Sequence, residues 1–168
     1  VGGENAINFL KAVRNMLAGS GKGTNMTVKW DGAPAIICGV NPENGKFFVG
    51  TKSVFNKTPK INYTSRDIAR NHGGVVADKL NVCLANLSRL RIKGILQGDL
   101  LFTNDLKAVT IDGEKMVSFT PNTITYAVPQ NSDLGKRILK AKMGIVFHTS
   151  YSGKTMDKLS AGFGTVTG

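Results

Sequence analysis

Cysteine and histidine are scarce in this chain. Of 168 residues, two are cysteine (Cys38 and Cys83) and two are histidine (His72 and His148). Both cysteines lie in apolar stretches without metal-ligand spacing, which predicts buried free thiols in a reducing compartment. No zinc-type cluster and no Ser/His/Asp arrangement stands out. His72 precedes two glycines, which indicates a loop or helix-end role rather than catalysis.

Long hydrophobic runs are also missing. No apolar stretch approaches the ~20 residues that a membrane-spanning helix needs, and no secretory signal pattern is visible. Hydrophobic residues make up 41% of the chain, which is an ordinary share for a globular protein. There is no internal repeat and no low-complexity tract. These features predict one domain with a real core, without a membrane partner.

Acidic residues are half as numerous as basic ones. The sequence has 11 Asp and Glu against 22 Lys and Arg, and its net charge is +11. This excess favours polyanionic partners, namely nucleic acid, nucleotide phosphates or an anionic surface; a merely soluble basic surface is the alternative. The basic residues form three loose groups: Lys52, Lys57, Lys60, Arg66 and Arg70; Arg89, Arg91 and Lys93; and Lys136, Arg137, Lys140 and Lys142.

The most informative motif is Val28-Lys29-Trp30-Asp31-Gly32. It closes a short expected strand, and a second apolar run, a turn cluster and a third strand follow it. Lys29 is therefore expected at a strand end, beside a hairpin that walls a pocket. A lysine two residues before an acidic residue and a glycine is the pattern of enzymes that attach a nucleotide to their own lysine.

A nucleophilic lysine needs special surroundings. With an ordinary pKa of about 10.4, roughly one lysine in a few thousand is neutral at pH 7. Val28 and Trp30 supply apolar bulk around Lys29, and Lys52 supplies a cation, both of which favour the neutral amine. Asp31 and Asp99 are the candidate ligands of Mg²⁺. The alternative is an exposed lysine at a strand end, with aspartates that cap turns.

With these motifs the chain resembles the adenylation domain of the covalent nucleotidyltransferases, which include ATP-dependent DNA ligases, RNA ligases and mRNA capping enzymes. It resembles more closely a set of ligase-like proteins from tailed marine phages. The resemblance rests on the order of four stretches: the Lys29 motif, Gly50-Thr51-Lys52-Ser53, Ile95-Leu96-Gln97-Gly98-Asp99-Leu100, and Ile145-Val146-Phe147-His148.

The resemblance implies a role for each matching residue. Lys29 becomes the adenylated nucleophile, in a nucleotide site lined by Val28, Trp30, Asp31, Gly32, Lys52, Asp99 and Phe147. Lys52 stands where the family usually has an arginine that contacts phosphate. The resemblance implies that Asp99 contacts the ribose, so its role stays open between sugar binding and metal binding. It implies that Phe147 stacks on the base. ATP and Mg²⁺ are the implied cofactors, and DNA or RNA is the implied partner.

Two motifs of the family are absent. After Tyr151 the sequence has neither the acidic-Gly strand that holds metal nor the Lys-x-Lys strand that touches the phosphates. This predicts a fragment that lacks the last two motifs, with a minimal or degenerate member as the alternative. A non-catalytic nucleic-acid-binding or phage structural module and a capping-type guanylyltransferase also remain possible. The phage resemblance implies the cytoplasm of an infected bacterium.

The expected fold is α+β, with mostly antiparallel sheets flanked by helices, and the resemblance makes it ATP-grasp-like. Helices are expected at 5–17, at 65–70 with Ser65 as cap, at 75–90 and at 133–142. Strands are expected at 27–30, 34–40, 46–50, 92–102, 116–119, 123–128 and 144–151. Residues 107–114 are expected to form a turn region.

Overall fold

The computed structural model describes residues 6–8 and 32–163, and these fall into two compact units within the single expected domain. We call residues 35–98 and 148–163 the basic unit, because it contains 12 Lys and Arg against four Asp and Glu. We call residues 6–8, 32–34 and 99–147 the balanced unit, because it contains six Lys and Arg against five Asp and Glu.

The basic unit begins with the expected hairpin. Strands β2 (Ala35–Val40) and β3 (Phe47–Gly50) are antiparallel, with Cys38 opposite Val49. The turn closes where the Gly45 N–H donates to the Asn41 carbonyl at 2.8 Å. These two strands and their turn are as predicted from the sequence.

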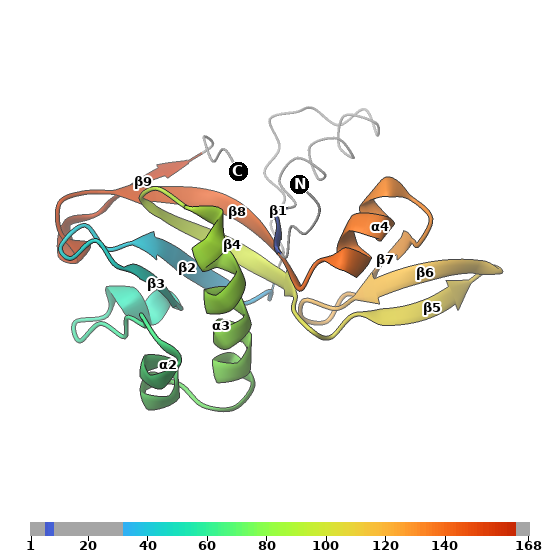
Figure 1. Cartoon of the computed structure of the whole chain (residues 1–168), viewed down its shortest axis with the longest axis horizontal. Helices are drawn as coiled ribbons and strands as arrows, with labels where there is room; N and C mark the ends of the chain where they lie inside the picture. The colour runs from blue at the N-terminus through green and yellow to red at the C-terminus, as the bar shows by residue number, and fades with distance from the viewer. Residues whose placement is uncertain (1–5, 9–31, 164–168) are drawn as a thin grey trace. The chain divides into compact units, whose positions relative to one another are not determined.

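Helices α2 (Ser65–Asn71) and α3 (Gly74–Leu87) also belong to this unit, and α3 contacts both α2 and β3 (Figure 1). Helix α3 and the short 3-10 helix η2 (Ser88–Leu90) together match the predicted helix. Its first turn is exposed: Val75 and Val76 are 67% and 46% exposed, and the buried positions begin at Leu80. The helix therefore projects its first turn past the core.

The two cysteines are free thiols without solvent exposure, as predicted. Cys38 lies on β2 and Cys83 on α3. Burial raises the pKa of Cys38, and it raises the pKa of Cys83 to about 12, so both stay protonated at neutral pH.

The balanced unit contains a three-stranded antiparallel sheet, ordered β5 (Lys107–Ile111), β6 (Glu114–Phe119) and β7 (Tyr126–Pro129). Helix α4 (Asp133–Lys140) contacts β6 and β7. The predicted turn region at 107–114 is wrong, because most of it is strand β5. Only Asp112 and Gly113, at φ 51° and 81°, form the turn, which is the Asp-Gly pair that two-residue hairpins favour.

The remaining strands are β1 (Ala6–Asn8), β4 (Ile95–Phe102), β8 (Met143–Ser152) and β9 (Ser160–Phe163). The hydrogen-bonding order is β1-β8-β4-β2-β3, with β9 also on β8. Strand β1 is parallel to β8, pairing Ala6 with Met143. The helix predicted at 5–17 is therefore wrong at residues 6–8, because strand pairing overrides the local apolar periodicity there. The rest of that helix and the strand predicted at 27–30 lie outside the described residues.

The fold class is α+β, as predicted, with sheets that contain both antiparallel and parallel pairs. The balanced unit has its own apolar cluster, in which the rings of Phe102, Phe119 and Tyr126 lie in sequence at 5.5 and 5.7 Å between centroids. The basic unit has another, around Ile37 and Phe48. Within the described residues, no helix has the length and apolar character to span a bilayer.

Candidate functional site

Four of the predicted site residues, Val28, Lys29, Trp30 and Asp31, lie outside the described residues. The motif's last residue, Gly32, is an exposed turn residue in the balanced unit. Its φ of +79° is one that side-chain-bearing residues rarely adopt, and a Cβ there would meet the side chain of Asn122. The positive φ favours glycine at position 32, and any larger residue would also require the exposed Asn122 side chain to move.

A backbone hydrogen bond joins the segment after this motif to the strand of Asp99. Asp99 is half-buried on β4, and the next residue, Leu100, donates its N–H to the Pro34 carbonyl at 2.9 Å. Both ends of this bond belong to the balanced unit. The bond thus places Pro34, two residues after Gly32, beside Leu100, which follows Asp99 on β4.

Phe147 also belongs to the balanced unit, on strand β8. Its ring is only 2% exposed, while His148, on the opposite face of the strand, is half-buried. A base can reach the Phe147 ring only if the residues that cover it move. The stacking role of Phe147 stays a prediction.

Lys52 lies in the basic unit, so the structure does not group it with Gly32, Asp99 and Phe147. It begins the 3-10 helix η1 (Lys52–Phe55), which Thr51 caps by accepting the Ser53 N–H at 3.2 Å. The Lys52 side chain is exposed. An exposed lysine at this position is accessible to an anionic ligand from the solvent.

Lys52 is part of a closed loop, residues 51–61, which we call the basic loop. Its ends meet where Val49 and Asn62 exchange two backbone hydrogen bonds, of 3.0 and 3.2 Å. Inside it, the Lys60 N–H donates to the Ser53 carbonyl at 3.1 Å, and Val54 is buried. The loop is therefore fixed at its base and anchored by one apolar side chain.

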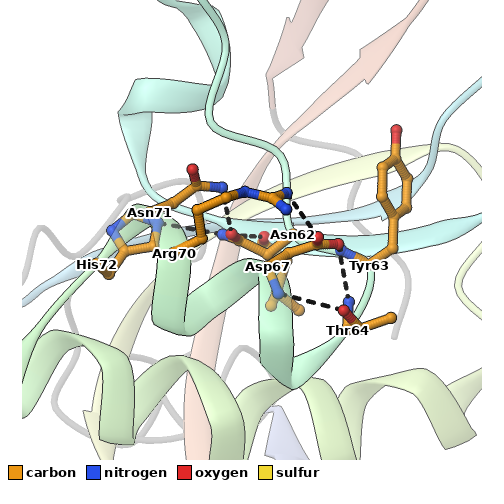
Figure 2. A network of polar contacts seen from close by, with 8 residues as sticks. Asn62, Tyr63, Thr64, Asp67, Arg70, Asn71 and His72 are labelled. Atoms are coloured by element: carbon orange, nitrogen blue, oxygen red, sulfur yellow. Dashed lines mark hydrogen bonds and ion pairs between the residues drawn. The ribbon is translucent and has the colours of Figure 1, made fainter.

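The buried amide of Asn62 ties the loop's end to helix α2 (Figure 2). Its Nδ2 group donates to the Val49 carbonyl at 3.0 Å and contacts Nε2 of His72 at 3.1 Å. Its Oδ1 accepts from Nδ2 of Asn71 at 2.9 Å. Because the amide nitrogen carries only donors, Nε2 of His72 must be the acceptor, which requires a neutral ring. Burial, and then the charge of Lys60, lower the pKa of His72.

A capping box starts α2 at Thr64, one residue before the cap predicted at Ser65. Thr64 Oγ1 accepts the Asp67 N–H, and the Asp67 carboxylate accepts the Tyr63 and Thr64 N–H groups (Figure 2). The Tyr63 bond, with help from Arg70 at 2.7 Å, lowers the pKa of Asp67. The Thr-x-x-Asp spacing of residues 64–67 is a capping-box pattern that can be recognised in the sequence. The predicted helix-end role of His72 is confirmed, because its N–H caps α2 on the Ile68 carbonyl.

Sequence reasoning missed an aromatic pair beside the basic loop. Phe55, at the end of η1, is 41% exposed, and its ring lies 5.1 Å from that of Tyr151 on β8. The Tyr151 hydroxyl donates to Oε1 of Gln97 at 2.6 Å. These residues are up to 96 positions apart in the sequence, so no local pattern joins them.

The metal prediction rests on one described residue. Among residues 6–8 and 32–163, no three His, Cys, Asp or Glu side chains cluster in a way that could hold an ion. Asp99 is described, while its predicted partner Asp31 is not. A site made by these two carboxylates and a nucleotide stays a prediction.

Comparison with known proteins gives one match. A family model described as a family of unknown function (DUF6267) matches residues 1–167. No curated protein and no solved structure matches the chain.

Proposed function

This chain belongs to the family of unknown function DUF6267, and we propose that it is an ATP-dependent nucleotidyltransferase that becomes adenylated on Lys29. The observation that carries the proposal is the Leu100–Pro34 hydrogen bond. It supports a pocket in which the Lys29 motif and Asp99 act together. The proposal includes the ATP-grasp-like architecture and, by the phage resemblance, a place in the bacterial cytoplasm.

The reaction is a nucleotidyl transfer to an amine. The lone pair of the Lys29 Nζ forms a bond to the α-phosphorus of ATP, and the bond to the β-phosphate oxygen breaks. Pyrophosphate leaves, and the amine loses a proton to solvent. Val28 and Trp30 favour the neutral amine by excluding water. The product is a lysyl-AMP phosphoramidate that can be passed to a DNA or RNA end.

The other residues bind and orient the nucleotide. Gly32 lets the backbone turn closely at the motif, and Asp99 holds the ribose or a metal ion. The family resemblance assigns the phosphates to Lys52 and the base to Phe147. Carboxylates and phosphate oxygens are the donors that Mg²⁺ prefers, so Asp31 and Asp99 suit this ion, which supplies charge neutralisation when bound.

Covalent labelling tests the proposal. The protein is incubated with Mg²⁺ and ATP or GTP labelled in the α-phosphate, at high nucleotide concentration, and run on a denaturing gel. We expect retained label with ATP, and its complete loss in Lys29→Ala, because the variant has no amine to form the phosphoramidate. Lys107→Ala, an exposed lysine of the balanced unit, is the matched control and should label normally.

Three outcomes discriminate between the candidate functions. Equal labelling of Lys29→Ala contradicts the proposed nucleophile. Label with GTP alone indicates a capping-type guanylyltransferase. The absence of label with either nucleotide favours a second candidate, a nucleic-acid-binding module without chemistry. The charge of the basic unit, 12 basic against four acidic residues, supports this second candidate independently of Lys29.

A further inference from the structure

The basic loop presents a large aromatic side chain to solvent while it buries a smaller, aliphatic one. Val54 is 1% exposed and anchors the loop, whereas the adjacent Phe55 is 41% exposed. Exposing a phenylalanine forgoes the stabilisation that its burial would provide. A single exposed apolar residue is common, so its surroundings decide whether it has a role.

The Phe55 ring is held in place from one side. It contacts Tyr151 at 5.1 Å between centroids and an angle of 47°. Tyr151 is fixed by its 2.6 Å hydrogen bond to Gln97. The loop that carries the ring is closed at its base by the Val49–Asn62 pair. A ligand that stacks on Phe55 therefore loses little conformational entropy by ordering it.

The loop that carries the ring is rich in basic residues. Lys57 and Lys60 follow Phe55 on the same loop, and both are exposed. Between Glu43 and Asp67 the sequence has five Lys and Arg and no Asp or Glu. Proteins that bind single-stranded nucleic acid combine these two features, positive charge for the backbone and aromatic rings for the bases.

We propose that Phe55, with Lys57 and Lys60, forms a binding site for single-stranded nucleic acid, in which a base stacks on the open face of the Phe55 ring. Lys57 and Lys60 bind the flanking phosphates. The site would hold a single-stranded part of the polynucleotide that the proposed function uses as its substrate. The choice of nucleic acid as the polyanion rests on that proposed function. At this site, an anionic polymer without bases would contact the two lysines but would not stack on Phe55.

The test compares a polyanion that has bases with one that has none. Binding of the full chain to a fluorescent oligothymidylate and to fluorescent heparin is measured by anisotropy, without ATP or Mg²⁺. Phe55→Ala and Phe55→Leu should weaken oligothymidylate binding by about five- to 100-fold, in the range of base–aromatic stacking. Heparin binding should stay unchanged, and Phe55→Trp should restore oligothymidylate affinity.

The lysines and the controls complete the design. Lys57→Glu with Lys60→Glu should weaken the binding of both polymers. Leu139→Ala, which removes an exposed apolar side chain of the balanced unit, should change neither. Melting curves identify any variant that does not fold, and Phe55→Leu keeps most of the contact with Tyr151.

Two results overturn the inference: equal oligothymidylate affinity in Phe55→Leu and the wild type, or equal losses for oligothymidylate and heparin. The second result would show that Phe55 only positions the lysines of the loop and does not stack on a base. The outcome is separate from that of the labelling experiment. Phe55→Ala should keep its label on Lys29, and Lys29→Ala should keep its oligothymidylate affinity.

Discussion

The two units of this chain differ in how they use polar residues. The basic unit has three times as many basic as acidic residues, and buried amides hold its loops. The balanced unit has nearly equal numbers of both signs, and a row of three aromatic rings lies in its core. The same chain thus carries its excess charge in one unit and the Asp99 end of the predicted pocket in the other. The proposed polyanion binding and the proposed nucleotide chemistry can therefore be tested separately.

The largest expected effect comes from the aromatic row of the balanced unit. Phe119→Ala removes the central ring, which is buried, and should lower the free energy of unfolding by ~3–5 kcal/mol. Hydrogen exchange should increase most in β5, β6 and β7. Leu139→Ala, at an exposed site of the same unit, should stay within about 0.5 kcal/mol of the wild type. An equal effect of the two changes would show that the row does not hold this unit together.

The second prediction compares the charges of the units. Lys57→Ala with Lys60→Ala should reduce the salt slope of oligothymidylate binding by about 1.4, at roughly 0.7 for each phosphate that the variant no longer neutralises. Lys136→Ala with Lys140→Ala, an exposed pair on α4 in the balanced unit, should leave the slope near its original value. Anisotropy titrations at several salt concentrations measure both slopes. Equal reductions would mean that the charge distribution between the units does not direct binding.

The smallest effect should come from pH. Because the pKa of His72 is lowered in the folded chain, the unfolded chain binds more protons around pH 6, and stability should rise with pH there. This contribution is complete above the unfolded pKa of about 6.5 and is lost as pH falls through the lowered folded pKa. Protonation removes the acceptor that Asn62 uses.

Thermal melts at pH 5 and 7.5 measure this dependence. His72→Gln keeps an acceptor for Asn62 and does not titrate, so its melting temperature should vary less over this range. Asp67 does not contribute to the difference, because its pKa is lowered from an already acidic value. A melting temperature of the variant that still varies as much as that of the wild type would exclude His72 as the cause.

Much of the fold could be predicted from local pattern. The β2–β3 hairpin has apolar runs around a turn cluster, apolar residues recur along α3, and Ser132 caps α4, so each element has a local signal for its structure. Strand β1 could not be found in this way, because its three residues are a strand only through pairing with β8. Strand β5 was missed because four of its five residues are exposed, which leaves no buried-face alternation to detect.

The candidate site was predictable in part. The order of the Lys29 motif and the Gly98-Asp99 pair suggested a common pocket, and the Leu100–Pro34 bond supports that neighbourhood. The pairing of Phe55 with Tyr151 depends on tertiary contact alone, so the sequence contained no sign of it. The Asn62–His72 contact was also hidden, since one asparagine among 14 is not distinctive.

The closed base of the basic loop has a consequence for protein engineering. The Val49–Asn62 pair joins the loop's two ends. A change in the length of the tip, Lys57 to Pro59, should therefore not shift β3 or α2. Lengthening a flexible loop is inexpensive, at about 0.6 kcal/mol for each doubling of its length. A peptide tag or a fluorescent label inserted between Thr58 and Pro59 should thus leave the strands beneath unaltered, while it separates Lys57 from Lys60 in the proposed binding site.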